Sequence, residues 1–122
     1  MSNPKVLVVD DDPGVLRFVA DALSIQGYEV HAAYGPVQAL ELVKAMPWFD
    51  LLVSDVIMPE MCGPELVRKI IERFPAIAVV MMSAECNAES LPTGATFIGK
   101  PFLLTDLYST LEKSLVKWVA PA

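Results

Sequence analysis

Short apolar segments alternate with amphipathic segments along the whole chain. The apolar segments have the length and β-branched content of buried strands, and they cover residues 5–10, 29–33, 51–54, 77–82 and, more briefly, 96–98. Apolar residues recur at helical spacing between and after them, over residues 13–27, 36–46, 64–73 and 104–119. Strands that are apolar throughout and separated by helices predict a parallel sheet covered on both faces.

Local signals support the helix boundaries. Asp12 is expected to cap the first helix, Pro13 suits its first position, and Gly27 suits its end. In the helix over 36–46 we expect Val37 to face inward or nearly so, together with its other apolar residues.

The predicted fold is a doubly wound α/β domain. We expect five parallel strands in the flavodoxin-like order 2-1-3-4-5, forming a single domain over residues 1–122. The connection between the fourth and fifth strands is short, because it has to fit within residues 83–95 and contains Pro92 and Gly94. We therefore expect a shortened or irregular fourth helix near residues 84–91.

Composition narrows the function classes. The chain has 122 residues, a formal charge of −6 and a mean hydropathy of +0.47. Its acidity argues against direct nucleic-acid binding, and no apolar run approaches the ~20 residues of a membrane span. Cys62 and Cys86 lack metal-ligand spacing, so we expect free thiols in a reducing, cytoplasmic setting.

Polar residues follow the strand ends. Asp10 and Asp11 end the first strand, and Asp55 ends the third. In the predicted strand order these ends flank the crevice where ligands bind in doubly wound sheets. Ser83 ends the fourth strand and Lys100 follows the fifth, so a hydroxyl and an ammonium reach the same edge.

This set of residues suits phosphoryl transfer. Clustered carboxylates repel one another, and a hard divalent cation such as Mg²⁺ offsets the repulsion. One carboxylate can then attack a phosphoryl group. The metal and Lys100 would neutralise charge on the transferring oxygens, and Ser83 could donate a hydrogen bond to one of them.

Four motifs resemble those of response-regulator receiver domains. They are VVDDD at residues 8–12, LVSDVIMP at 52–59, MSA at 82–84 and KPF at 100–102. They occur in the family's order and spacing, and the resemblance covers nearly the whole chain. It implies that Asp55 is the phosphoacceptor and that the protein works in two-component signalling.

The resemblance also implies a metal ligand set. Asp11 is expected to bind Mg²⁺ directly beside Asp55, Asp10 to act largely through water, and the backbone carbonyl of Ile57 to complete the protein ligands. The peptide bond between Lys100 and Pro101 is expected to be cis, an option that X-Pro bonds hold at low cost.

The resemblance further implies a switch and its partners. Ser83 is the expected switch hydroxyl, and Phe97 is the aromatic side chain that moves inward with it. A histidine kinase or phosphotransfer protein would supply the phosphoryl group, and an unknown downstream protein would read the result. The domain would catalyse its own phosphorylation and some dephosphorylation with Mg²⁺ without being an enzyme in the usual sense. Its oligomeric state stays open.

Two alternatives remain. An aspartyl-phosphate hydrolase, similar to haloacid-dehalogenase-type phosphatases, would need a second acid two residues beyond its nucleophile. Ile57 occupies that position after Asp55, and Pro13 occupies it after Asp11. A flavodoxin-like interaction module that is not phosphorylated is the other alternative, but the acidic residues with Ser83 and Lys100 argue against it.

The chain departs from the family pattern at three points. Cys62 stands before Gly63 where an acid is common, the crossover after Ser83 is short, and Ile57 is bulky and apolar where many relatives are polar. We hypothesise that Ile57 hinders water and prolongs the phosphorylated state. His31, in an early edge strand without a paired base, is not expected to be catalytic.

Overall fold

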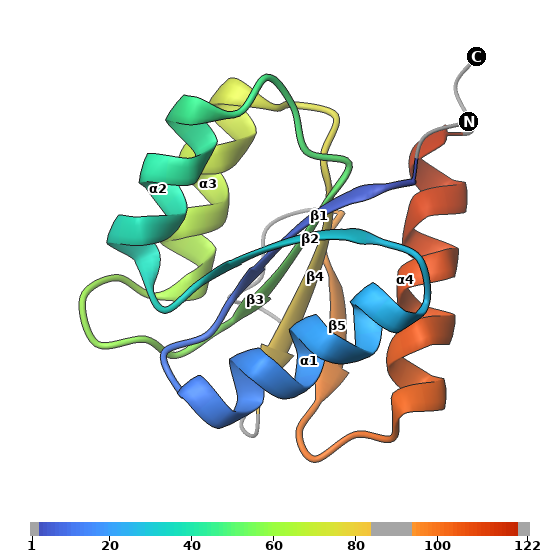
Figure 1. Ribbon diagram of the computed structural model, residues 1–122. Coiled ribbons are helices and arrows are strands. Elements are labelled where there is room, and N and C mark those ends of the chain that lie inside the picture. The colour runs from blue at the N-terminus through green and yellow to red at the C-terminus, as the bar shows by residue number, and fades with distance from the viewer. Residues whose placement is uncertain (1–2, 84–93, 120–122) are drawn as a thin grey trace.

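The computed structural model describes residues 3–83 and 94–119, which form one parallel sheet between two layers of helices (Figure 1). The strands are β1 (Lys5–Val9), β2 (Glu29–Ala33), β3 (Leu51–Asp55), β4 (Ala78–Ser83) and β5 (Thr96–Gly99). The helices are α1 (Pro13–Ile25), α2 (Pro36–Ala45), α3 (Gly63–Arg73) and α4 (Leu104–Val119). The strand order is β2-β1-β3-β4-β5, so the predicted topology is confirmed.

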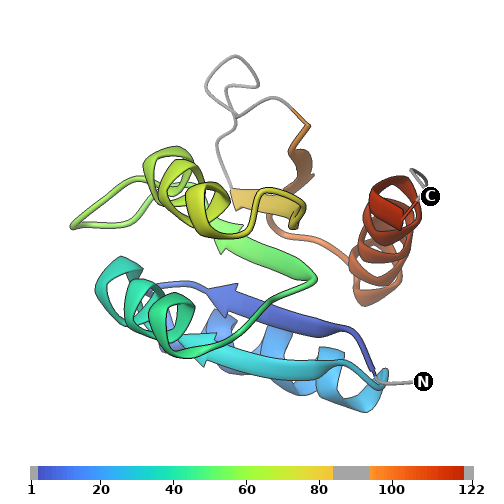
Figure 2. The same cartoon turned by 90° about the horizontal axis from the view of Figure 1, so that it is seen from above.

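Each face of the sheet is covered by two of these helices. Helices α1 and α4 lie on one face and α2 and α3 on the other, as the two views show (Figures 1 and 2). Successive strand residues serve opposite layers: Leu7 packs in the cluster with the α2 and α3 side chains, whereas Val6 and Val8 pack in the cluster with those of α1 and α4. Burial on both faces explains why the strands are apolar throughout.

The first helix begins and ends where local signals place it. The Oδ1 atom of Asp12 accepts hydrogen bonds from the backbone N–H groups of Gly14 at 2.8 Å and Val15 at 3.3 Å, which confirms the predicted cap. The helix ends at Ile25, and Gly27 has a φ of 96°, a conformation that favours glycine.

One orientation was predicted wrongly. The side chain of Val37 is 56% exposed, although the pattern placed it inward. The buried residues of α2 are Pro36, Ala39 and Val43, so the helix is rotated slightly from the predicted orientation. Most residues of this short helix are apolar and lie on several sides of it, so the pattern does not distinguish between neighbouring rotations.

Some of the sequence predictions concern residues that the structure does not describe. The predicted short helix near residues 84–91, and Cys86 with it, lie outside the described residues. Cys62 is an exposed free thiol. No helix in the described part of the chain is long and apolar enough to cross a membrane.

Candidate functional site

The carboxyl ends of β1 and β3 bring two acids together. Val9 pairs with Ser54 in the parallel register, so the next residues, Asp10 and Asp55, are neighbours on adjacent strands. Asp10 is fully buried and Asp55 is 9% exposed. The sheet therefore fixes both carboxylates at its carboxyl edge, as the sequence predicted.

Asp11 completes an acidic triad. Carboxylate oxygens of Asp10, Asp11 and Asp55 lie within 4.8 Å of one another, and Asp11 is exposed while the other two are buried. Three hard oxygen donors at this spacing, with one side open for water, fit the preferences of Mg²⁺. Their mutual repulsion gives a divalent cation a strong electrostatic reason to bind.

Lys100 reaches the acids along the same carboxyl edge, from the end of the edge strand β5. Ser83 pairs with Gly99, and the backbone N–H of Lys100 donates to the carbonyl of Ser83 at 2.8 Å. The Lys100 Nζ atom lies 2.8 Å from Asp10 Oδ2 and 3.6 Å from Asp55 Oδ1. The peptide bond from Lys100 to Pro101 is cis, the geometry that the resemblance implies. The ammonium thus contacts two of the three acids.

The buried Asp10 is held at both of its oxygens. Its Oδ2 atom accepts from Lys100, and its Oδ1 atom accepts from the backbone N–H of Asp12 at 2.9 Å. This arrangement compensates the burial of a charged group, which is costly without partners. It also orients the carboxylate relative to Asp55.

The surroundings shift the protonation of two groups. Burial raises the pKa of Asp55 above its ordinary value, and the charge of Asp10 adds to the effect, while the ammonium of Lys100 opposes it. Burial by itself lowers the pKa of Lys100, but the hydrogen bond from Lys100 to Asp10 and the charges of Asp10 and Asp55 outweigh it and leave the pKa raised. Lys100 is therefore a permanent cation at neutral pH.

Gly63 is a residue whose role at this site the sequence did not reveal. A Cβ atom there would lie 2.9 Å from the Cα of Val56 and closer still to the carbonyl oxygen of Asp55. Its N–H donates to the carbonyl of Val56 at 2.7 Å. A glycine is required because α3 begins directly against the backbone of Asp55. In the sequence Gly63 only precedes the predicted helix over residues 64–73, and that position does not reveal the close approach to β3.

The expected switch residues occupy the neighbouring strands. Ser83 is buried and lies one residue beyond Met82, the partner of Asp55 in the register. Phe97 lies on β5, is half-buried and pairs with Met81 of β4. The side chain of Ile57 is 60% exposed, and its backbone N–H lies 3.5 Å from Asp55 Oδ1.

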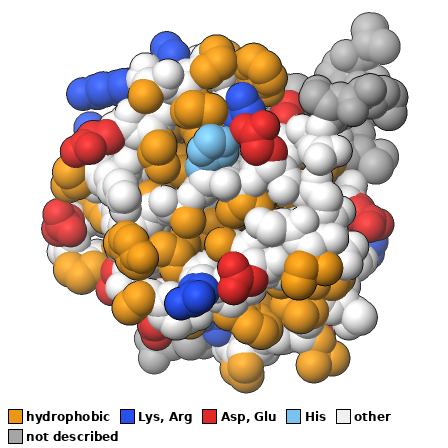
Figure 3. Space-filling view, in the orientation of Figure 1, with side chains coloured by type: hydrophobic (Ala, Val, Ile, Leu, Met, Phe, Trp, Pro, Cys, Tyr) orange, Lys and Arg blue, Asp and Glu red, His pale blue; other side chains and the backbone are white. Residues whose placement is uncertain are grey.

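His31 is not part of this site, and it has a partner that the sequence did not suggest. It lies on the edge strand β2, and its Nε2 atom is 2.8 Å from Glu29 Oε2. Its ring also contacts Phe49 edge-on at 5.5 Å between centroids. The face seen in Figure 3 carries hydrophobic side chains interspersed with charged ones. The pair with Glu29 corrects the expectation of an unpaired histidine.

Comparison with known proteins identifies the family. The family described as the response regulator receiver domain matches residues 6–112. The chain belongs to this receiver family. As a receiver domain it is a module of two-component signalling rather than an enzyme of the usual kind, and its acidic triad is typical of receiver Mg²⁺ sites.

Its relatives include short and long proteins. The receiver domain is 34% identical to the response regulator receiver protein CpdR of Brucella abortus (strain 2308), over 92% of this chain and 97% of CpdR. It is 38% identical to the sensor kinase CckA of the same organism, again over 92% of this chain, but it spans 12% of CckA. A CheY-like receiver structure from Methanospirillum hungatei JF-1 superimposes with a TM-score of 0.88 at 29% identity, covering 96% of this chain and 97% of that one.

Proposed function

We propose that this receiver domain is a signalling switch that accepts a phosphoryl group on Asp55 from a histidine kinase or phosphotransfer protein. The proposal treats residues 1–122 as one domain acting in the cytoplasm. The observation that carries it is the joint position of three carboxylates within 4.8 Å and the Lys100 ammonium 3.6 Å from Asp55. The match of a segment of the sensor kinase CckA supports a kinase as the class of partner.

The proposed transfer is a displacement at phosphorus. An Asp55 carboxylate oxygen forms a bond to phosphorus while the bond from phosphorus to the donor's histidine nitrogen breaks. The leaving imidazole keeps the electron pair and holds a proton on its other nitrogen. Lys100, beside Asp55, would stabilise negative charge on the phosphoryl oxygens.

Mg²⁺ would be held by Asp10, Asp11 and Asp55, with the backbone carbonyl of Ile57 as a further ligand. When bound, it supplies positive charge to the transferring oxygens. Asp10 keeps Lys100 in position through the 2.8 Å contact, and Asp11 offers an exposed oxygen at the open side. The domain would also remove some of its own phosphate by admitting water at this open side.

The output would pass through Ser83 and Phe97. A phosphoryl group on Asp55 offers new acceptor oxygens to the Ser83 hydroxyl at the end of the adjacent strand. Movement of Ser83 would let Phe97 turn inward and shift the population toward a second surface conformation. A downstream protein would recognise that surface through protein contacts.

The test is phosphorylation with a small donor. The protein is incubated with Mg²⁺ and acetyl phosphate or phosphoramidate, and intact mass is compared with that of Asp55→Asn. We expect one phosphoryl adduct on the unsubstituted protein, no adduct on Asp55→Asn, and strongly reduced labelling with Lys100→Met.

Other outcomes would change the assignment. Rapid multiple turnover of phosphomonoesters would favour a hydrolase. The absence of an adduct with every donor, including a phosphorylated histidine kinase, would favour an interaction module that is not phosphorylated. Labelling that persists in Asp55→Asn would assign the phosphoacceptor to another residue.

A further inference from the structure

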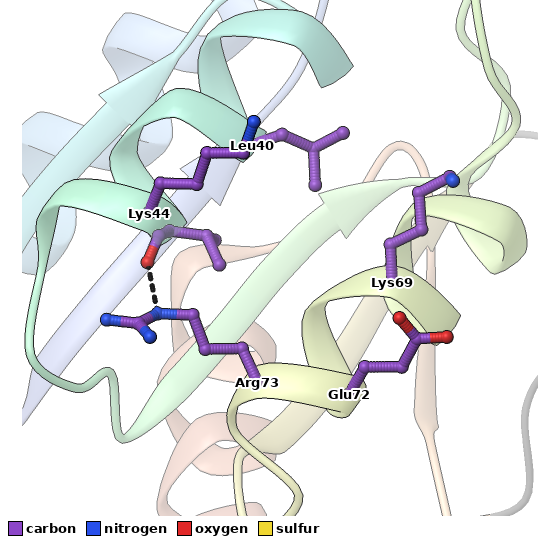
Figure 4. Close-up of a pocket in the computed structure, with 6 residues that line it drawn as sticks. Leu40, Lys44, Lys69, Glu72 and Arg73 are labelled. Carbon is purple, nitrogen blue, oxygen red and sulfur yellow. Dashed lines mark hydrogen bonds between the residues drawn. The ribbon is translucent and has the colours of Figure 1, made fainter.

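A groove lies between α2 and α3, away from the acidic site. Its volume is 710 Å³, and it is lined by Leu40, Val43 and Lys44 of α2 and by Lys69, Glu72 and Arg73 of α3. Leu40 is partly exposed and Val43 is buried, so they provide an apolar floor. In Figure 4, Lys44 stands on the α2 side and Lys69 on the α3 side, and the Leu40 side chain extends between them.

One end of the groove is fixed by Arg73. Its Nε atom donates to the carbonyl of Val43 at 2.6 Å and its Nη2 atom to the carbonyl of Met46 at 2.8 Å. These carbonyls end α2 and lack partners within the helix. Arg73 therefore ties the two helices together, and the groove has a preformed wall that needs little reorganisation to accept a ligand.

Lys44 and Lys69 are available to an incoming group. Both are exposed, and neither forms an ion pair with any side chain that the structure describes. With Arg73, three of the chain's nine basic residues line this groove, although the formal charge of the whole chain is −6. Blue side chains are visible over α2 and α3 at the upper left of Figure 3. Glu72 is the one acidic side chain among the lining residues that the structure describes, so the groove keeps a net positive charge on an acidic molecule.

We propose that this groove docks an acidic amphipathic helix of a partner protein. An apolar side chain of that helix would enter against Leu40 and Val43, and carboxylates on its flanks would meet Lys44 and Lys69. A nucleic acid is a poorer fit, because its phosphates extend beyond the groove and would meet the acidic remainder of the surface. An acidic helix can confine its charge to the few residues beside the two lysines.

The docking site lies at the opposite end of the sheet from Asp55. Lys44 and Arg73 are in the last turns of α2 and α3, and these helices run antiparallel to the strands, whose carboxyl ends carry the acidic triad (Figure 1). The partner can therefore bind while Asp55 is being modified. The proposal is independent of the assignment of Asp55 as phosphoacceptor.

The test is a titration with a designed peptide. The probe is a capped helical peptide of about 14 residues, roughly 21 Å long, with leucines at i and i+4 and glutamates beside them. A matched peptide carries lysine in place of each glutamate. Amide chemical shifts of the receiver domain are followed by NMR. We expect the acidic peptide to shift amides within residues 40–46 and 66–73, and the basic peptide to leave them unchanged.

Charge reversal makes the test specific. Lys44→Glu/Lys69→Glu should weaken binding of the acidic peptide by roughly tenfold or more, because two exposed attractions become repulsions. The same variant should gain binding of the basic peptide. Arg17→Glu/Lys113→Glu changes the net charge equally outside the groove and should bind the acidic peptide as the unsubstituted protein does. Lys44→Ala/Lys69→Ala serves as a second variant in case reversal impairs folding.

Several results would overturn the proposal. They are the absence of groove shifts at millimolar acidic peptide, equal binding of both peptides, and equal weakening by the control variant. Stronger shifts of the same amides with single-stranded DNA, or with vesicles of phosphatidylglycerol and phosphatidylcholine, would assign the groove to a different class of partner.

Discussion

At the scale of single residues, the site depends on how closely the chain after β3 returns to the strand. A Cβ atom added to Gly63 would lie 2.9 Å from the Cα of Val56 and closer still to the carbonyl oxygen of Asp55. Both neighbours are backbone atoms and cannot rotate away. A side chain at this position would push the start of α3 away from β3, the strand that carries Asp55.

Gly63→Ala should therefore destabilise the domain by about 1–3 kcal/mol, the range for overpacking a close contact. Gly35→Ala is the matched control: it lies at an extended φ of 178°, and its added Cβ would meet only Glu60 Oε1, at an ordinary 3.7 Å. Urea unfolding of the two variants measures the difference. Equal stability of the two would show that α3 adjusts freely.

Asp55→Asn should stabilise the metal-free protein at neutral pH. The folded state raises the pKa of Asp55, chiefly by burial, so ionising this group costs more in the folded than in the unfolded protein. The cost is absent below the unfolded pKa and becomes complete as pH rises through the folded pKa. The unfolding temperatures of both proteins are measured in the presence of a chelator between pH 4 and 8. The variant should exceed the unsubstituted protein by a margin that grows with pH and reaches a few degrees, or roughly 1 kcal/mol.

The prediction is wrong if the variant is less stable than the parent at pH 7, or if the difference between them does not depend on pH. Either result would mean that the contact of Asp55 with Lys100 balances or outweighs burial and the repulsion from Asp10.

Ile57→Asn should shorten the lifetime of the phosphorylated state. The Ile57 side chain is 60% exposed and follows Asp55 by two residues, so it can cover the open side of the site. A smaller polar residue would admit and orient water. We expect phosphate loss to become severalfold faster, as measured by the decay of the phosphoryl adduct in intact mass spectra. An unchanged or slower decay would remove Ile57 from this role.

At the scale of elements, the carbonyl groups at the C-terminal end of α2 obtain hydrogen-bond donors from the neighbouring helix α3. Arg73 of α3 donates to two carbonyls at the end of α2, and no contact of this kind is encoded in the sequence of α2 itself. The two helices therefore stabilise each other beyond their shared apolar cluster. This coupling also shapes the groove proposed as a docking site.

Arg73→Gln should lower the free energy of unfolding by about 1–2 kcal/mol, because carbonyls at a helix end lose a charged donor. Arg68→Gln removes the same charge from an exposed position of α3 and should cost less than about 0.5 kcal/mol. Hydrogen exchange should become faster in residues 43–46 of the Arg73 variant alone. Similar decreases in the free energy of unfolding of both variants would mean that the loss of a positive charge, rather than the loss of the hydrogen bonds to α2, is the cause.

The elements also show what sequence can and cannot predict. The strands and the Asp12 cap follow from local patterns, and the strand order follows from the fold type that their alternation with helices indicates; these predictions are confirmed. Asp10, Asp11, Asp55 and Lys100 were expected at one edge because parallel strands share a carboxyl edge. Gly63 and Arg73 were not predicted, since their roles arise from distances between segments, which neither periodicity nor composition contains. The inward orientation predicted for Val37 was wrong, because the apolar pattern of this short helix is compatible with two neighbouring rotations about its axis.

At the scale of the whole molecule, charge is unevenly distributed. A chain of formal charge −6 concentrates three acids at one end of its sheet and three basic residues in a groove toward the other end. Repulsion within the acidic triad and from the negative charge of the rest of the chain favours cation binding to the folded domain. Salt weakens the contribution of the more distant charges.

Mg²⁺ should raise the unfolding temperature of the whole domain. A cation that binds only the folded state adds about 1.4 kcal/mol at a concentration of roughly ten times its Kd. Asp11→Asn should lose most of this gain, whereas Asp21→Asn, which removes an exposed carboxylate on α1 outside the acidic triad, should retain it. Differential scanning calorimetry with and without a chelator measures both. Equal gains in the two variants would mean that Mg²⁺ acts on general surface charge.

The contact between Asp10 and Lys100 joins residues that are 90 positions apart in the chain. The acids of β1 acquire their ammonium only after β5 has been synthesised and has joined the sheet. A chain still emerging from the ribosome, or a fragment cut before β5, would carry Asp55 without this cation. The complete arrangement of acids and ammonium is thus a property of the closed five-stranded sheet, and it is absent from any shorter piece of it.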